Sequence, residues 1–434
     1  MDIIRNNILN KGGSAMTNDT RTRKESQVGR KEPEVITLRD FMVDTRGYLL
    51  EIGIKAGLAV MAEMFAADVE AICGQRYEHR KLRKATRWGV TNGEVVLGGK
   101  KVTVKRPRVR SSGHEVGLST YERFKDASPL TERVLEQILS GVSTRRYRRS
   151  LETNPFDFDM RGISKSAVSR RFVMATAERI ARWMDKPLDE LDIVALFMDG
   201  IALGDHMIVA AVGIDAEGYK YALGIWEGAT ENAVVCQALI DNLISRGLDA
   251  DKVLLFIIDG SKALSKAIRQ SFGANAVIQR CQRHKMENVK AHLPKGLQTI
   301  VLQEMRRAYQ SKDVNKARGI LKGVIHRLED VHPGAAASLK EGLEQTLTII
   351  KLKLSRDLGR SLQTTNIVEN AMSLVRYATR NVKRWRNGKM ALRWAATGFM
   401  EAEKRFRRIN GYKSIPQLLT ALKEYSELDK EDAA

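Results

Sequence analysis

Three acidic residues of the sequence, Asp199, Asp259 and Glu369, have the side-chain type and the surroundings needed to hold metal ions. Asp199 and Asp259 each follow a continuous apolar run and precede a glycine, a pattern that predicts a buried strand ending in a turn. Sites in open α/β sheets form at this carboxyl edge of the strands. Glu369 falls one turn into a predicted helix, which could pack against the same edge. The three carboxylates are therefore expected to share one crevice.

Carboxylates held this close are expected to need a cation. Without one they repel, and one of them is driven to its neutral form. A hard divalent cation with oxygen ligands removes the conflict. Three carboxylates can hold two Mg²⁺ or Mn²⁺ ions about 3.5–4 Å apart, one activating the attacking nucleophile and the other stabilising the leaving oxygen.

The residues alone leave alternatives open. A single Asp-Gly after a strand is a common turn signal, although two of them after matched buried strands are harder to obtain by chance. Four other acids compete with Glu369 for the third place, namely Glu287, Glu304, Glu341 and Asp357.

The two aspartates fall in a region, residues 191–285, whose pattern predicts a mixed β-sheet. The predicted strands cover 193–198, 207–214, 219–226, 253–258 and 276–278, and the predicted helices cover 231–245 and 262–272. Three strands, a helix, a strand, a helix and a strand is the order of an RNase H-like fold. The first three strands would form an antiparallel meander, and the fourth would lie beside the first in parallel. That adjacency would bring Asp199 next to Asp259.

Residues after the predicted sheet are expected to be helical. Residues 286–357 show helix-length segments with few strand signals, which predicts a helical insertion inside the catalytic fold. Residues 358–425 are expected to hold the helix of Glu369, capped by Thr364 or Thr365, and basic C-terminal helices.

Three regions precede the predicted sheet. Residues 1–36 are polar and charged and are expected to be disordered. Residues 37–110 predict a helical segment and then a basic hairpin with two short strands around Gly98 and Gly99. Residues 111–190 are expected to be helical, and a break before a helix capped by Ser164 resembles a helix-turn-helix. The whole chain is thus expected to be a multidomain α/β protein.

Positive charge is concentrated in two stretches of the chain. The 434 residues include 73 Lys+Arg and 52 Asp+Glu, a net charge of +21. Residues 76–110 hold twelve basic and two acidic residues, and residues 372–410 hold eleven and two. Solvated charged faces usually mix signs. A basic globular protein with such clusters is expected to bind a polyanion, and nucleic acid is the default partner.

Candidate DNA contacts come from the basic regions and from the helix-turn-helix. Four cations are expected to contact phosphates or bases, namely Lys105 and Arg106 in the hairpin and Lys165 and Arg170 in the second helix. A plain structural hairpin is the alternative for the first pair. Arg384 and Trp385 could stack on unpaired bases near a cut end. Packing onto the core is equally open for Trp385 and is favoured for Trp394.

The cysteines indicate no disulfide framework. Cys73, Cys236 and Cys281 are too few and too scattered for one, which is typical of a cytoplasmic protein. No apolar run reaches membrane-spanning length, and the first residues lack the apolar core of a signal peptide. A membrane partner is therefore not expected.

Cys281 and His284 have half of a zinc site's spacing. His292 is the only nearby third candidate and no fourth ligand is evident, so a zinc site is not favoured. A structural or DNA-contacting role near the active site is expected, with a packed cysteine and a surface histidine as the alternative. The basic neighbours favour phosphate contact; they are Arg280, Arg283 and Lys285.

Taken together, the motifs resemble the Mutator-type family of bacterial insertion-sequence transposases. The matching segments run from about residue 45 to 420. They are TNGEVVLGGKKVTVKRPRVR at 91–110, GVSTRRY at 141–147, FMDG at 197–200, IIDGSKAL at 257–264, CQRHKMENV at 281–289, TTNIVEN at 364–370, VKRWRNGKMALRW at 382–394 and EAEKRFRRINGY at 401–412. The resemblance implies an Asp-Asp-Glu triad of Asp199, Asp259 and Glu369 in an RNase H-like core interrupted by a helical insertion. Arg283 and Asn366 are expected near this site or at the DNA.

The resemblance also implies a function. The enzyme is expected to bind the terminal inverted repeats of an insertion sequence, expose 3′-OH ends and join them to target DNA by two-metal phosphoryl transfer. Two ends acting together imply a homodimer or larger assembly, working at the nucleoid in the bacterial cytoplasm. The alternatives are an RNase H-like nuclease without strand transfer and a non-catalytic DNA-binding regulator.

Overall fold

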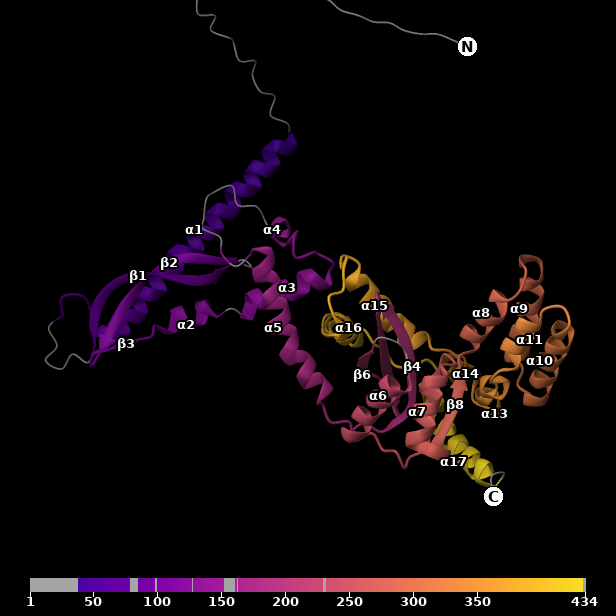
Figure 1. Cartoon of the computed structure of the whole chain (residues 1–434). Helices are drawn as coiled ribbons and strands as arrows, with labels where there is room; N and C mark the ends of the chain where they lie inside the picture. The colour runs from indigo at the N-terminus through magenta and orange to yellow at the C-terminus, as the bar shows by residue number, and fades with distance from the viewer. Residues whose placement is uncertain are drawn as a thin grey trace, which may run out of the picture. The chain divides into compact units, whose positions relative to one another are not determined.

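The computed structural model describes residues 38–78, 85–97, 100–126, 128–151, 161, 163–228 and 232–431 (Figure 1). The chain divides into two compact units, residues 1–55 and residues 56–434. Of the first unit, the structure describes the opening turns of helix α1 (Leu38–Cys73). The segment 1–36, for which the sequence predicts disorder, lies outside the described residues. All features discussed below belong to the second unit.

The hairpin expected from the sequence forms strands β1 (Thr86–Leu97) and β2 (Lys100–Ser111), which pair antiparallel. Both strands are longer than expected, and an unpredicted third strand, β3 (His114–Val116), pairs with β2. Val95 and Val109 are fully buried against Phe65 of α1 and Tyr121 of α2 (Ser119–Lys125). Alternation along the strands therefore buries one face of the hairpin and leaves the other polar. The predicted turn at 98–99 lies outside the described residues.

A helical segment follows, made of α3 (Ser128–Leu139), α4 (Tyr147–Ser150) and α5 (Lys165–Met184). The hydroxyl of Ser164 accepts a hydrogen bond from the Ala167 N–H at 3.3 Å, so Ser164 is the expected N-cap. Between α3 and α4, Gly141 has φ +88°, a left-handed conformation that ends helices.

The central sheet has five strands, β4 (Ile193–Leu203), β5 (His206–Asp215), β6 (Lys220–Gly228), β7 (Leu254–Ile258) and β8 (Ala276–Arg280), in the order β6-β5-β4-β7-β8. The first three strands pair antiparallel, and β7 pairs in parallel with β4 and with β8. The predicted meander and the parallel adjacency of the first and fourth strands are therefore confirmed. Strand β4 continues past Asp199, where the sequence predicts its end, because Asp199 and the next four residues pair with β5.

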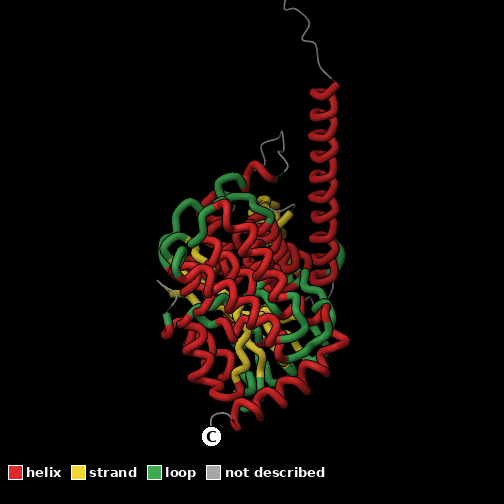
Figure 2. Tube along the Cα trace, turned by 90° about the vertical axis from the view of Figure 1, so that its right-hand side faces the viewer, coloured by secondary structure: helices red, strands yellow, loops and turns green. Residues whose placement is uncertain are grey.

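Helices cover both faces of this sheet (Figure 2). Met198 and Ile258 pack with α6 (Ala233–Ser245) and α7 (Lys262–Phe272). Their neighbours Phe197 and Ile257 face the other way, toward α15 (Asn366–Thr379) and α16 (Gly388–Glu403). Because side chains alternate along a strand, a residue that follows Met198 or Ile258 lies on the α15 side.

The segment between β8 and α15 is helical, as predicted. It comprises α8 (Gln282–Ala291), α9 (Lys295–Tyr309), α10 (Val314–Glu329), α11 (Pro333–Lys340), α12 (Leu343–Thr346), α13 (Thr348–Lys351) and α14 (Arg356–Leu362). Helices α8 to α11 stand together beside the β8 edge and share a hydrophobic core (Figure 1). The last helix, α17 (Ile415–Glu431), packs on the core of the sheet through Ile415, Leu418 and Leu422.

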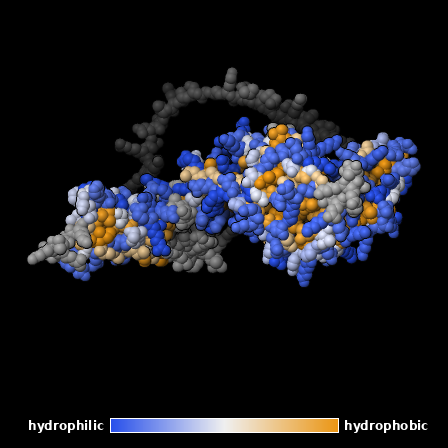
Figure 3. Space-filling view, turned by 90° about the horizontal axis from the view of Figure 1, so that it is seen from below, coloured by the Kyte–Doolittle hydropathy of each residue, from blue (hydrophilic) through white to orange (hydrophobic). Residues whose placement is uncertain are grey.

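The face of the molecule shown in Figure 3 is mainly polar. Hydrophilic residues cover most of the face shown in Figure 3, and apolar residues form smaller patches between them. None of the described helices has the length and apolar character that crossing a bilayer requires.

Candidate active site

Asp199 and Asp259 lie side by side at the edge where β4 and β7 stop pairing. The last paired residues of the two strands are Met198 and Ile258, and each aspartate comes next in its chain. Asp199 is buried, and its Oδ1 accepts the Gly200 N–H at 2.9 Å. Asp259 is half-buried, and its Oδ1 accepts the Ser261 N–H at 2.8 Å. Each carboxylate is thus held by a backbone amide that follows it closely in the chain.

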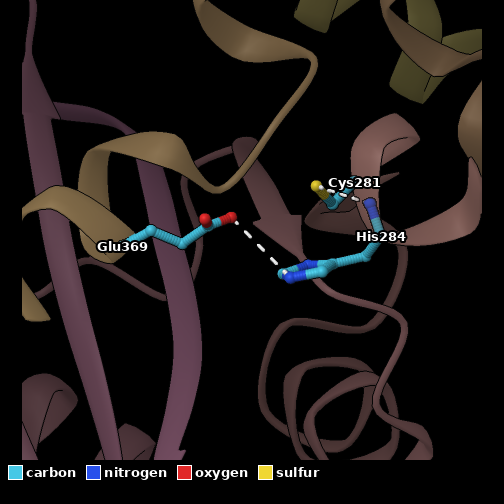
Figure 4. A group of neighbouring side chains, drawn as sticks. All are labelled: Cys281, His284 and Glu369. Carbon is cyan, nitrogen blue, oxygen red and sulfur yellow. Dashed lines mark hydrogen bonds and ion pairs between the residues drawn. The ribbon is translucent and has the colours of Figure 1, made fainter. Parts of the chain in front are cut away.

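Glu369 reaches the same place from the first turn of α15, one turn after Thr365, the cap position expected from the sequence. Thr365 makes no side-chain cap bond; its hydroxyl donates to Glu369 Oε1 at 3.1 Å. Arg283 donates to Glu369 Oε2 at 2.8 Å, and His284 Nε2 lies 3.7 Å from Oε1. Figure 4 shows the Glu369 carboxylate and the His284 ring pointing toward one another. Val368 and Met372 bury the other face of α15 against the sheet, which fixes the helix.

The electrostatics of Asp199 reflect its burial and the two other carboxylates. Burial raises the pKa of Asp199 to about 7, with a further contribution from the charge of Asp259 and a smaller one from Glu369. His284 and the Gly200 N–H oppose the shift. This is the conflict expected of clustered carboxylates, in which one is driven toward its neutral form. A cation bound among them would favour the ionised form.

The acids that compete with Glu369 in the sequence have other positions. Glu287 pairs with Lys290 of the same helix at 3.1 Å, and Glu304 pairs with Arg327 of α10. Neither appears among the charges that shift the pKa of Asp199, whereas Glu369 does. The charges that act on Asp199 therefore favour Glu369 over these two acids as the third carboxylate.

Cys281 and His284 form a second group of ligand-type atoms next to Glu369. The buried Cys281 Sγ accepts the His284 N–H at 3.5 Å as the N-cap of α8, and also the Thr365 N–H at 3.4 Å. Cys281 thus joins the start of α8 to the start of α15. Ligand atoms of Cys281, His284 and Glu369 lie within 4.8 Å of one another and could hold a metal ion. His292, the third zinc candidate from the sequence, packs against Gly334 of α11 instead.

The Cys281–His284 contact also changes both pKa values. The hydrogen bond with Cys281 raises the pKa of His284 to about 9, although burial opposes this. Burial acts to raise the pKa of the Cys281 thiol, but hydrogen bonds from His284 and Thr365 outweigh it and the pKa is lowered. Both shifts act in the direction of the charged forms, and the His284 ring lies beside Glu369.

Two of the three basic neighbours of this pair do not suit phosphate contact. Arg280 is buried and donates to the carbonyls of Gly260 and, at 3.0 Å, Glu341. Lys285 donates to the carbonyls of Ser338 at 2.6 Å and Glu341 at 2.8 Å, and burial lowers its pKa to about 8. The phosphate interpretation is wrong for these two residues, because they neutralise the carbonyl end of α11.

Arg283 differs from these two neighbours. Its side chain is 54% exposed and binds both Glu369 and the side chain of Asn366, the latter at 2.8 Å. Arg283 and Asn366 thus lie beside the carboxylates, as expected from the sequence. The roles of Arg280 and Thr365 in holding the site were not predicted, since only their tertiary contacts reveal them.

The remaining candidates for DNA contact differ in how far their charges are already engaged. Lys105 is exposed, as are Lys165 and Arg170 at the start of α5, and Arg384. Arg106, in contrast, pairs with Glu115 at 2.6 Å and lies over the Tyr121 ring at 4.7 Å.

The two tryptophans of the basic C-terminal stretch both pack against other side chains. Trp385 is half-buried against the sheet core and adjoins Gly204 in the β4–β5 turn. Trp394 packs on Phe172 with ring centroids 4.6 Å apart. The packing expected of Trp394 is confirmed, and packing also describes Trp385.

The chain is similar to known transposases over most of its length. A family profile described as “Transposase, Mutator family” matches residues 52–408. The “Transposase for insertion sequence element ISRM5” of Rhizobium meliloti (strain 1021) is 26% identical over 381 residues, covering 86% of this chain and 92% of the relative. The “Transposase for insertion sequence element IS256 in transposon Tn4001” of Staphylococcus aureus is 26% identical over 322 residues, covering 71% and 78%. The “Transposase for insertion sequence element IS6120” of Mycolicibacterium smegmatis is 29% identical over 258 residues, covering 56% and 75%.

Proposed function

The chain belongs to the Mutator family of transposases, and on that basis we propose that it cuts and joins DNA with Asp199, Asp259 and Glu369 as its catalytic carboxylates. The observation that carries this proposal is their convergence, from β4, from the end of β7 and from the first turn of α15, on one edge of the sheet. The strand order and the helical insertion support an RNase H-like catalytic core.

The donor set fits hard divalent cations. Asp199, Asp259 and Glu369 offer oxygen ligands, which Mg²⁺ and Mn²⁺ prefer. When bound, the two metal ions would activate a water or 3′-hydroxyl and stabilise the leaving 3′-oxygen. The chain's own groups orient the ligands: backbone amides hold the aspartates, and Thr365 and Arg283 hold Glu369. The thiol of Cys281 is too soft a ligand for these ions, so it serves as a cap and not as part of this site.

The reaction proposed has two steps at one site. Cleavage exposes a 3′-OH at each end of the insertion sequence, and that hydroxyl then attacks target DNA. Both steps are phosphoryl transfers, so the same three carboxylates serve both. The protein would act as a homodimer or larger assembly that holds two terminal inverted repeats together, at the bacterial nucleoid.

Strand transfer by a pre-cut end tests the function. A labelled duplex that already carries the 3′-OH of the terminal repeat is incubated with a target plasmid, the protein and Mg²⁺. The transposase is expected to move the label into the plasmid. A nuclease would degrade the DNA without joining it, and a regulator would bind the duplex and leave it unchanged. Either of those two results would refute the proposal.

Binding experiments should separate phosphate contacts from base contacts. Lys105→Gln removes an exposed charge of the hairpin, and we expect it to weaken binding to all duplexes and to reduce the log–log salt slope by about 0.9. Lys165→Gln with Arg170→Gln is expected to lower the preference for the terminal repeat over random duplex by about 1–3 kcal/mol. Titration of both variants with both DNAs measures the two effects. Equal weakening on both DNAs for the α5 variant would show that α5 is not the recognition helix.

A further inference from the structure

A groove of about 590 Å³ opens next to Asp259. One wall is α7, which contributes Lys262, Ser265, Lys266 and Arg269. The opposite wall is formed by residues 341–345 of the helical insertion, and two of these residues are acids, Glu341 and Glu344. Gly260, the residue after Asp259, and Arg280 line the groove between the two walls. A molecule lying in the groove would therefore run along α7 from Gly260, the residue that follows Asp259.

The basic residues of this groove share one face of α7. Lys262, Lys266 and Arg269 stand four and then three residues apart, the spacing that places side chains above one another on a helix. All three are exposed, whereas Leu264 and Ile268 bury the opposite face in the sheet core. With a rise of 1.5 Å per residue, the row is about 10 Å long. The face is therefore a straight row of cations that begins beside the site.

The acids of the groove already have cationic partners. Glu344 pairs with Arg318 at 2.7 Å and Lys351 at 3.0 Å, and the hydrogen bond from Arg318 lowers its pKa to about 2. The Glu341 carboxylate lies within 4.0 Å of Lys262, Arg280 and Lys285, so three cations already surround it. The negative charge of each acid is therefore already balanced by other cations, and neither acid pairs with Lys266 or Arg269.

Lys266 and Arg269 have no partner of opposite charge among the residues that the structure describes. Within the described part of the chain, neither side chain makes an ion pair or a hydrogen bond. The helix itself supplies no acid, because its sequence is KALSKAIRQSF. Two unbalanced cations on one helix face create a field that attracts polyanions. They also lie outside both basic stretches of the sequence, so the groove is a separate positive surface.

We propose that this groove binds the phosphodiester backbone of the DNA strand that passes the active site, with Lys266 and Arg269 as phosphate contacts. The inference rests on the proposed function, because it assigns a path to the DNA on which that function acts. Lys266 and Arg269 stand three residues apart, about 4.5 Å along the helix axis, and the phosphates of one strand advance about 3.4 Å each along a duplex axis. Neighbouring phosphates of one strand can therefore engage one cation each, whereas a small anion would engage one of the two.

A pair of charge-matched variants tests the groove. Lys266→Gln with Arg269→Gln removes two cations from α7, and Arg306→Gln with Arg307→Gln removes two exposed cations from α9 as a control. Cleavage under single-turnover conditions is measured against DNA concentration, at several salt concentrations. The α7 variant is expected to need about tenfold more DNA for half-maximal cleavage, a loss of about 1.4 kcal/mol of binding. Its log–log salt slope should fall by about 1.8, because two cations no longer bind phosphates.

The rate at saturating DNA should stay near that of the wild type, because Lys266 and Arg269 would bind DNA without touching the reacting atoms. The α9 variant should match the wild type in every measure. Equal behaviour of the two variants, or a loss of rate at saturation without a change in half-saturation, would overturn the proposal. Lys266→Arg with Arg269→Lys keeps both charges and should restore binding, which excludes misfolding as the cause.

Binding in EDTA separates this inference from the proposed function. Fluorescence anisotropy with a labelled DNA end reports binding without cleavage. Weaker binding by the α7 variant supports the groove even if the wild type fails to cut DNA, in which case the catalytic proposal falls alone. Unchanged binding by the α7 variant, with a wild type that cuts DNA normally, overturns the groove alone.

Discussion

Asp199→Asn, Asp259→Asn and Glu369→Gln are each expected to abolish DNA cleavage and strand transfer. Each change keeps the side-chain volume and removes the ligand charge, so the loss falls on metal binding and not on packing. Metal ions contribute several kcal/mol of transition-state stabilisation, which corresponds to a loss of at least about 10³-fold in rate. Cleavage of a labelled terminal repeat measures this loss of rate, and binding of the same DNA is measured in parallel.

Glu287→Gln is the matched control for the carboxylate variants. Glu287 is an exposed acid of α8 that pairs with Lys290 and competes with Glu369 in the sequence. Its loss should leave cleavage within about twofold of the wild type, since an exposed ion pair is worth about 0–1 kcal/mol. Near-normal cleavage by any of the three carboxylate variants would remove that residue from the site, and strong loss in Glu287→Gln would reopen the choice of the third acid.

Removal of divalent metal is the second change with a large expected effect. EDTA should stop cleavage, and Mg²⁺ or Mn²⁺ should restore it. Ca²⁺ is larger and accepts looser geometry, so it should allow the DNA complex to form but support little chemistry. Gel-shift and cleavage assays on the same samples give the two readouts, and full activity in EDTA would refute the two-metal mechanism.

The metal requirement should also depend on pH. In the metal-free protein the pKa of Asp199 is raised to about 7, chiefly by burial. Below about pH 7 Asp199 holds a proton, which a cation must displace in order to bind. The apparent affinity for Mg²⁺ should therefore fall as the pH drops from 8 to 6. Because one proton is released, the half-saturating Mg²⁺ concentration should rise by at most about tenfold for each pH unit below 7. A half-saturating concentration that is constant over this range would show that Asp199 is not a ligand.

The sheet and the place of its two aspartates follow from the sequence alone. Buried strands appear as apolar runs, and the runs ending at Met198 and Ile258 are followed directly by Asp199 and Asp259. The order of strands and helices then predicts that β4 and β7 are parallel neighbours, which the pairing confirms. These inferences succeed because they depend on short-range periodicity and on chain order, both of which are local properties of a sequence.

Packing in three dimensions determines which other side chains meet the aspartates. Glu369 reaches them because α15 packs on the face of the sheet to which the alternation of β4 and β7 turns both carboxylates. Sequence distance carries no such information, so four other acids compete with Glu369 until the packing is known. The same reason explains Arg280 and Lys285, which are basic in the sequence but buried against the carbonyl end of α11 in the structure.

The groove beside Asp259 is likewise determined by packing in three dimensions. Its walls come from α7 and from residues 341–345, about 80 positions apart in the chain. Charge counts along the sequence identify the two dense basic stretches but not this surface. Its cations are few, and the acids near them already have cationic partners. Charge balance depends on distances between side chains, and folding alone sets those distances.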